Sequence, residues 1–151
     1  MKEFLYPASL STIAYQREGR RRRASSYDRR GGNDDRVHIA PGETLTLASL
    51  EGPGMITHLW MTIATDSRER EQDYLRKMTI RMFWDGEKTP SVEVPVGDFF
   101  GMGHGMARNF VSAPLQMSPE DGKGFNCWFP MPFESAVLTI ENECHENMTV
   151  Y

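Results

Sequence analysis

The sequence predicts an all-β fold, an antiparallel jelly-roll β-sandwich with one short surface helix. Short segments rich in β-branched and aromatic residues recur along the chain between turn signals, as is typical of such a sandwich. Only one segment has strongly helical character, and the alternation of strands with helices that builds a parallel sheet is absent. With 151 residues, 39% of them hydrophobic and 25% charged, the chain suits one domain with a buried core.

The first half of the chain alternates strand patterns with turns. The expected elements are a short helix at 8–17, strands at 37–39, 44–50 and 55–65, and turns at Pro41-Gly42 and Gly52-Pro53-Gly54. The strand at 44–50 alternates polar and apolar residues, which places Leu45 and Leu47 on its inner face. In the following strand we expect His58 to be a hydrogen-bonded packing residue rather than a catalyst.

The second half begins with the one helix and then returns to strands. Residues 66–77 begin with capping and acidic residues and end with basic ones, which favours a helix with a solvated face. Pro95 is expected to end one strand, and Pro130 and Pro132 another. Frequent glycines predict an irregular loop over residues 95–105. The other expected elements are strands at 78–84, 91–94, 111–117, 125–129, 136–140 and 149–151, and turns at Asp85-Gly86 and 119–122.

Charge is distributed unevenly between a basic arm and an acidic body. Residues 1–30 carry eight basic and three acidic side chains, whereas residues 31–151 carry nine and eighteen. We therefore divide the chain into a basic arm at 1–24, which includes the short helix, and a jelly-roll domain at 25–151. The four arginines at 20–23 lack interleaved aromatics, so we expect them to neutralise acidic surface on this chain or a neighbouring subunit rather than to bind nucleic acid.

Neither a membrane span nor an export signal is visible in the sequence. No apolar run approaches the roughly 18 residues of a membrane helix, so we expect no membrane partner and a cytoplasmic protein. Cys127 and Cys144 lie in or beside apolar strands and are expected to be reduced, with a disulfide between them as the alternative. The four histidines are scattered without metal-ligand spacing, so nothing suggests zinc, and we expect no metal. We also expect no organic cofactor.

The polar stretch at 25–35 is the first candidate site. It holds Asp28, Arg29, Asn33 and Asp34 around a Gly-Gly pair and has no aliphatic side chain. Such side chains offer fixed donors and acceptors of the kind that bind sugar hydroxyls. The alternative is a solvated loop whose aspartate and asparagine side chains only cap turns.

The glycine-rich stretch at 95–105 is the second candidate site. Asp98 stands beside Phe99 and Phe100, and a carboxylate next to aromatic rings resembles a sugar site in which an aromatic face stacks on the ring. The alternative is that the two rings plug the end of the sandwich while Asp98 caps a turn. We expect Asp28 and Asp98 to converge on one pocket.

Ordered motifs along roughly residues 17–142 closely resemble one family. They are Ser25-Ser26-Tyr27-Asp28-Arg29 with Gly31-Gly32-Asn33-Asp34, then Gly52-Pro53-Gly54-Met55-Ile56, Phe83-Trp84-Asp85-Gly86, Pro90-Ser91-Val92-Glu93-Val94-Pro95, Gly97-Asp98-Phe99-Phe100-Gly101 and Cys127-Trp128-Phe129-Pro130-Met131-Pro132-Phe133. The family was catalogued as a domain of unknown function and later recognised as glycoside hydrolases of the difructose-anhydride synthase/hydrolase, α-fructofuranosidase and α-arabinofuranosidase type. The resemblance implies a double jelly roll, related in shape to viral capsid proteins, that assembles as trimers or hexamers.

The resemblance also implies where catalysis resides. Family chains are more than twice as long, and their catalytic glutamates are expected in a second jelly roll that has no counterpart here. The chain is therefore expected to be an N-terminal half, truncated at its C-terminal end, with no catalytic residue of its own. Glu93 is the best in-chain candidate for a carboxylate partner of Asp98, although a structural role is expected. The competing hypothesis is a non-catalytic glycan-binding or assembly module of capsid-like jelly-roll type.

Overall fold

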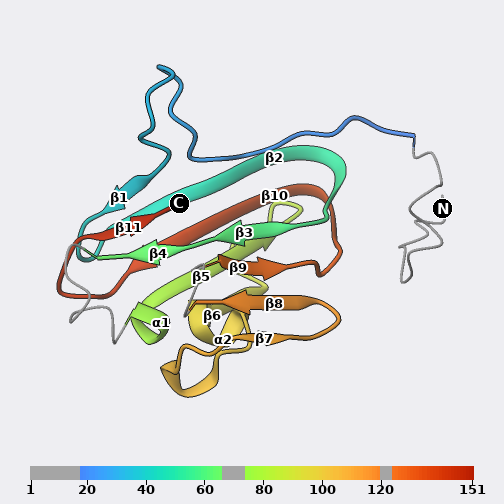
Figure 1. The fold of residues 1–151 in the computed structure, drawn as a ribbon. Helices are drawn as coiled ribbons and strands as arrows, with labels where there is room; N and C mark the ends of the chain where they lie inside the picture. The colour runs from blue at the N-terminus through green and yellow to red at the C-terminus, as the bar shows by residue number, and fades with distance from the viewer. Residues whose placement is uncertain (1–17, 66–73, 120–123) are drawn as a thin grey trace.

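The computed structural model describes residues 18–65, 74–119 and 124–151, and within these it is an antiparallel β-sandwich (Figure 1). Three short helical turns, α1, α2 and η3, lie at one edge of it. The helical turns are α1 (Tyr74–Lys77), α2 (Val96–Phe99) and η3 (Gly103–Gly105), and the strands are β1 (Val37–Ile39), β2 (Thr44–Ile56), β3 (Leu59–Met61), β4 (Ile63–Ala64), β5 (Met78–Trp84), β6 (Val92–Pro95), β7 (Phe110–Val111), β8 (Leu115–Ser118), β9 (Gly124–Cys127), β10 (Met131–Asn142) and β11 (Met148–Val150).

The pairing of early strands with late ones has the pattern of a jelly roll. β1 pairs with β11, β2 with β10 and β3 with β9, all antiparallel, so the two halves of the chain form one long ribbon. That ribbon wraps around the core as two layers. One layer has the order β2-β10-β5-β6, and the other consists of β1-β11-β4 and β3-β9-β8-β7. The predicted all-β antiparallel sandwich is confirmed.

Thr62 joins the β1-β11-β4 and β3-β9-β8-β7 sheets into one layer. It separates β3 from β4, and its backbone exchanges two hydrogen bonds with Tyr151, with N···O distances of 3.0 and 3.4 Å. The pairing of β4 with β11 therefore continues past the end of β4. On one side of Thr62, β4 pairs with β11, and on the other side β3 pairs with β9. Strands from the early and late parts of the chain therefore meet here.

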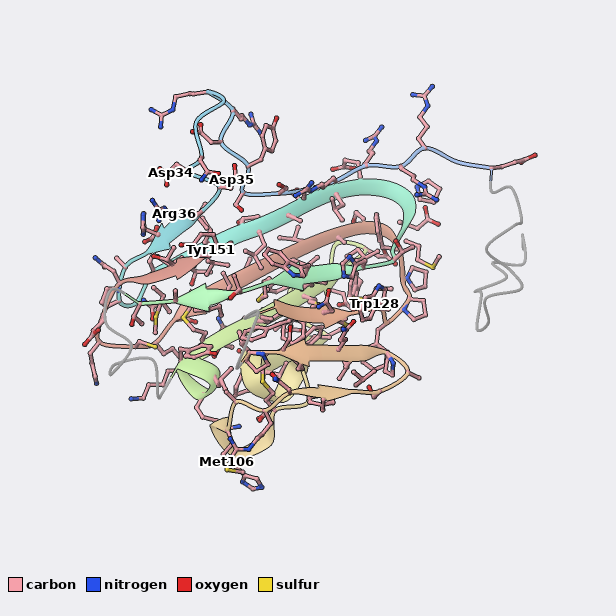
Figure 2. The ribbon with its side chains drawn as sticks, viewed as in Figure 1. Asp34, Asp35, Arg36, Met106, Trp128 and Tyr151 are labelled. Carbon is pink, nitrogen blue, oxygen red and sulfur yellow. The ribbon has the colours of Figure 1, made fainter. Side chains whose placement is uncertain are left out.

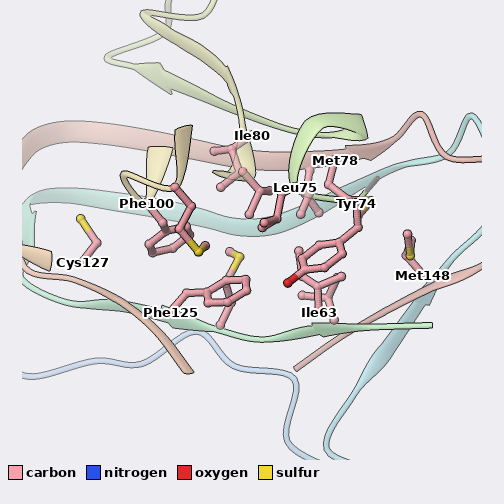
Figure 3. Packing of buried hydrophobic residues seen from close by; sticks show 14 of the residues in the cluster. Ile63, Tyr74, Leu75, Met78, Ile80, Phe100, Phe125, Cys127 and Met148 are labelled. Carbon is pink, nitrogen blue, oxygen red and sulfur yellow. The ribbon is translucent and has the colours of Figure 1, made fainter. Parts of the chain in front are cut away.

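The core lies between the two layers and forms one cluster of buried side chains (Figure 3). Ile80 and Ile140 from one layer are fully buried, and Ile63, Phe125 and Met148 from the other are at most 3% exposed. The predicted inward positions of Leu45 and Leu47 are confirmed, since both are half-buried and pack against this cluster. Burial of apolar surface from both layers is the main force that holds them together.

The glycine–proline motif does not end a strand, contrary to the prediction. β2 continues to Ile56, and its pairing with β10 runs past Gly52-Pro53-Gly54 with an irregularity between Phe133 and Ser135. A Cβ on Gly52 would lie 2.5 Å from the carbonyl oxygen of Glu134, so this glycine permits the close approach of the two backbones. The predicted strand at 55–65 is consequently divided among the end of β2, β3 and β4.

The strand predicted at 125–129 ends at Cys127, before Pro130, but Pro132 does not interrupt a strand as predicted. Pro132 lies inside β10, opposite Met55 of β2. β5 joins the other edge of β10 only from Ala136 onward. At Pro132 that edge is not paired in the sheet, so the N–H that proline lacks costs no ladder hydrogen bond there.

Residues 95–105 are not wholly irregular, contrary to the prediction. Pro95 precedes the single turn of α2, and η3 follows it. A Cβ on Gly97 would lie 2.8 Å from the carbonyl oxygen of Leu75, so Gly97 lets α2 pack directly on α1. The glycine that suggested a loop thus allows close packing of two helical turns.

The remaining predictions have mixed outcomes. The turn at Asp85-Gly86 is confirmed, with φ of 53° and 80° at the two residues, and both cysteines are buried and form no disulfide in the described residues. The strand predicted at 111–117 is instead the hairpin of β7 and β8. Of the predicted helix at 66–77, the described part is α1, and the helix predicted at 8–17 lies outside the described residues. In the part of the chain that the structure covers, no helix is long and apolar enough to cross a membrane.

Candidate functional site

The first candidate site is the loop of residues 25–36, which precedes β1 and is closed by its own hydrogen bonds. Asp35 Oδ1 accepts from the backbone N–H of Asp28 at 2.6 Å, and its carbonyl accepts from Ser26 Oγ at 3.0 Å. Asp28 Oδ1 accepts from the backbone N–H of Arg30 at 2.9 Å, and the Asp28 carbonyl accepts from Gly31 at 3.1 Å. Residues 26 and 28 are therefore tied to residue 35, and the loop holds one shape.

Asp28 has the structural role that the alternative interpretation assigned to it. Its side chain is only 8% exposed, and a Cβ on Gly32 would lie 2.4 Å from its Oδ2. The carboxylate is therefore covered by the turn that it caps. Asp28 positions the loop and offers little surface to a ligand.

Four side chains of this loop face solvent instead. Tyr27 is 57% exposed, and the guanidinium of Arg29 lies 5.9 Å from the centre of its ring, within range of a cation–π contact. Asn33 is exposed, and Asp34 accepts from Arg36 Nε at 2.5 Å with half of its side chain accessible. The loop thus exposes an aromatic face, a guanidinium, an amide and a carboxylate.

The loop is also joined to the end of β11. Arg36 Nη1 donates to the hydroxyl of Tyr151 at 3.5 Å, and Figure 2 shows Asp34, Asp35, Arg36 and Tyr151 grouped at one edge of the sandwich. The hydrogen bond to Tyr151 and then that to Asp34 raise the pKa of Arg36 above its ordinary value. This arginine connects the exposed carboxylate to the body of the fold.

The second candidate site is held by an ion pair and by core packing. Arg76 Nη1 donates to both carboxylate oxygens of Asp98 at 2.5 Å, and the Asp98 side chain is 33% exposed. Phe100 is fully buried, 5.6 Å from Phe125 between ring centres, and Phe99 meets Phe100 edge to face at 5.0 Å. Phe100 therefore plugs the core and is not accessible to a sugar, which corrects its prediction as a binding residue.

The structure does not bring Asp28 and Asp98 together. Figure 1 shows the loop of residues 25–36 beyond β1 and β2, whereas α2, which carries Asp98, lies at the opposite edge beside β6 and β7. The expected shared pocket within one chain is therefore wrong. The two motifs are separate features of the surface.

Glu93 is paired with an arginine rather than with Asp98. Arg81 Nε donates to Glu93 Oε1 at 2.6 Å, and Arg81 Nη1 donates to Glu141 Oε2 on the neighbouring strand. These hydrogen bonds, led by that to Glu93, raise the pKa of Arg81. Glu93 thus belongs to a cross-strand ion-pair network on the outer face of β6, β5 and β10.

Sequence reasoning missed Tyr27, Asp35 and Arg36 in the first site. Tyr27 could have been found, because an aromatic residue among polar neighbours with no apolar partner nearby is expected to be exposed. Asp35 could not, because its role depends on the chain folding back over seven residues. Within the described ranges, no group of three or more His, Cys, Asp or Glu side chains is arranged to hold a metal ion.

A known protein family matches most of the chain. The family model described as GH172 domain-like matches residues 32–150, which include Asn33, Asp34 and Asp98 and exclude Asp28 and Arg29. No curated protein matches the chain.

Proposed function

Because the chain belongs to the GH172 domain-like family, and so carries a glycoside hydrolase family domain, we propose that it is the N-terminal jelly roll of a hydrolase acting on α-linked furanosides or difructose anhydrides. The observation that carries the proposal is the loop of residues 25–36. Its backbone is held by internal hydrogen bonds, while Tyr27, Arg29, Asn33 and Asp34 remain exposed. Such a loop is arranged before the substrate arrives, which lowers the entropic cost of binding.

The exposed groups have complementary chemistry for a sugar. Asn33 offers an amide donor and acceptor, and Asp34 accepts hydroxyl hydrogens through the oxygen not engaged by Arg36. Arg29 supplies guanidinium donors beside the ring of Tyr27, whose face is suited to the C–H side of a furanose. In this proposal the loop positions the substrate and performs no proton transfer.

We propose that the catalytic carboxyl groups lie outside this jelly roll. Retaining glycosidases need two carboxyl groups about 5–5.5 Å apart, one as the nucleophile and one as the acid/base. In the described part of the chain, the candidate carboxylates Glu93 and Asp98 are each engaged by an arginine, Arg81 or Arg76. We therefore assign the catalytic glutamates to a second jelly roll of the family, and we expect assembly as a trimer or hexamer.

The test joins this chain to a C-terminal jelly roll of the family and measures hydrolysis of an aryl α-furanoside. A hydrogen bond to a charged group contributes about 1.5–3 kcal/mol, so Asp34→Asn should lower kcat/KM about tenfold to a hundredfold, with Asn33→Ala similar or weaker. Glu51→Gln, at an exposed position of β2, is the matched control and should leave kcat/KM unchanged. Unchanged activity in both loop variants would refute the positioning role of the loop.

We also propose that Asp98 and Phe99 contact substrate. Substitution of Asp98 separates a role in substrate binding from a role only in the ion pair with Arg76. If Asp98 contacts substrate, Asp98→Asn lowers kcat/KM and leaves the melting temperature unchanged. If it serves only the ion pair with Arg76, the melting temperature falls instead. Turnover by the 151-residue chain alone that is lost in a Glu93→Gln and Asp98→Asn double variant would show that the catalytic pair lies in this chain.

A further inference from the structure

The outer face of β3 and β9 carries a group of aromatic and amide side chains, of which His58 and Trp60 are exposed and Asn126 and Trp128 half-buried. Met61, Phe125 and Cys127 point into the core, so the alternate residues Trp60 and Asn126 point outward, opposite each other in register. His58 and Trp128 flank this pair. We call these four residues, His58, Trp60, Asn126 and Trp128, the β3–β9 face.

Hydrogen bonding and stacking hold the β3–β9 face in one arrangement. Asn126 Nδ2 donates to the carbonyl of Gln116 on β8 at 3.3 Å, so the amide oxygen is the atom that faces His58. His58 Nε2 lies 3.0 Å from that oxygen and must therefore donate to it. The imidazole also stacks on the indole of Trp128, with ring centres 5.0 Å apart and an angle of 11°.

Trp60 completes the face with an accessible ring and donor. Its side chain is 49% exposed, and in the described part of the chain its indole N–H has no hydrogen-bond partner. A Cβ on Gly124 would lie 3.3 Å from Trp60 Nε1, so this glycine leaves room for the indole beside β9. The ring is therefore placed over the sheet rather than buried in it.

We propose that the β3–β9 face binds an uncharged saccharide. Flat aromatic surfaces stack on the C–H faces of sugars, while the Trp60 N–H and the unbonded side of the imidazole can meet hydroxyl groups. None of the four residues is Asp, Glu, Lys or Arg, which disfavours phosphate or other ionic ligands as the occupant. The hydrogen-bonded imidazole and amide also give this aromatic surface fixed polar groups, which a purely apolar docking face would lack.

This surface is distinct from the loop of residues 25–36. Figure 2 shows Trp128 well separated from Asp34 and Asp35, which lie at another edge of the sandwich. The choice of a saccharide as the ligand rests on the proposed function, but its binding needs neither that loop nor catalysis. The β3–β9 face would hold one part of a glycan on the domain while another part of the same glycan is hydrolysed.

The experiment titrates the 151-residue chain with an α-1,5-linked arabinofuranose trisaccharide and follows the tryptophan indole N–H signals by NMR. The chain has three tryptophans, and Trp84 lies on β5 in the other layer, so it is an internal control. We expect the Trp60 and Trp128 signals to shift and the Trp84 signal to remain in place. Trp60→Ala should weaken binding about tenfold, and Asn126→Ala should weaken it by a smaller factor.

Matched variants separate this inference from the proposed function. Val137→Ala removes an exposed apolar side chain from β10 and should leave the affinity unchanged. Saccharide binding that survives Trp60→Ala but is lost in Asn33→Ala would refute the β3–β9 face as the binding site. It would instead support the loop of residues 25–36 as the binding site. Absence of any shift at millimolar saccharide, or a change of oligomeric state by light scattering in Trp60→Ala without effect on binding, would also overturn it. Melting temperatures of all variants check that the fold is retained.

Discussion

Asn142 is predicted to be the polar side chain on which the fold depends most, and Asn142→Ala tests this. It ends β10, is fully buried and makes three hydrogen bonds to backbone groups. Its Nδ2 donates to the carbonyls of Ile39 at 2.8 Å and Glu146 at 2.7 Å, and its Oδ1 accepts from the N–H of Cys144 at 2.9 Å. It thus connects β10 in one layer with β1 and the approach to β11 in the other.

The expected cost follows from the groups that alanine would leave without a partner. Ile39 is 0% and Cys144 8% exposed, so water cannot easily replace the lost bonds at these two residues. A buried polar group without its partner costs about 1–3 kcal/mol, and the less buried bond to Glu146 adds a smaller amount. The free energy of unfolding should therefore fall by about 3–6 kcal/mol, a large part of the 5–15 kcal/mol typical of a domain.

Thermal unfolding followed by circular dichroism measures this effect. For a domain of this size about 1 kcal/mol corresponds to about 2–4 °C, so the melting temperature of Asn142→Ala should fall by about 6–24 °C. Asn33→Ala removes the same amide from an exposed position and should change stability by less than about 0.5 kcal/mol. A fall below about 3 °C in Asn142→Ala would refute the assigned role of its three hydrogen bonds.

Three further changes test the packing, the thiol and the ion pairs. Gly52→Ala should lower the melting temperature by several degrees because its Cβ would lie 2.5 Å from a backbone oxygen of β10, whereas Gly103→Ala, with nothing within 4 Å, should not; equal effects would contradict the packing argument. Burial raises the pKa of the Cys127 thiol above its ordinary value, so thiol reagents at pH 8 should label it slowly in the folded protein and fast in urea. The stability that it contributes should be present below the thiol's unfolded pKa and should be lost as pH rises from there through the raised folded pKa. Arg81→Ala should cost about 1–2 kcal/mol at low salt, because Glu141 loses its partner, and less at 1 M salt; an unchanged urea midpoint would show the network to be neutral.

Local patterns were sufficient to predict the fold class and most strands. The alternation at residues 44–50 places Leu45 and Leu47 against the core, and the Asp85-Gly86 pair forms the turn that its residue types favour. These features depend on the conformational preferences of neighbouring residues, which the sequence states directly. The ordered family motifs likewise indicated the jelly-roll fold.

Glycine and proline positions could be interpreted only with the structure. Gly52 and Gly97 are required by close contact with Glu134 and Leu75, residues far away in sequence, and Pro132 is tolerated because β5 is absent beside it. A glycine that frees a turn and one that permits close packing have the same local signature. Which of the two applies is decided by long-range contacts that no sequence window contains.

The sequence by itself determined which residues are too polar for the core, and so placed both candidate sites at the surface. Only the tertiary structure decided what each side chain does there. Asp28 caps its own loop, Asp98 binds Arg76 and Phe100 enters the core, whereas Trp60 is left exposed on β3. The physical reason is that a side chain's partner depends on how strands from both ends of the chain pair across the sandwich, and that pairing is non-local.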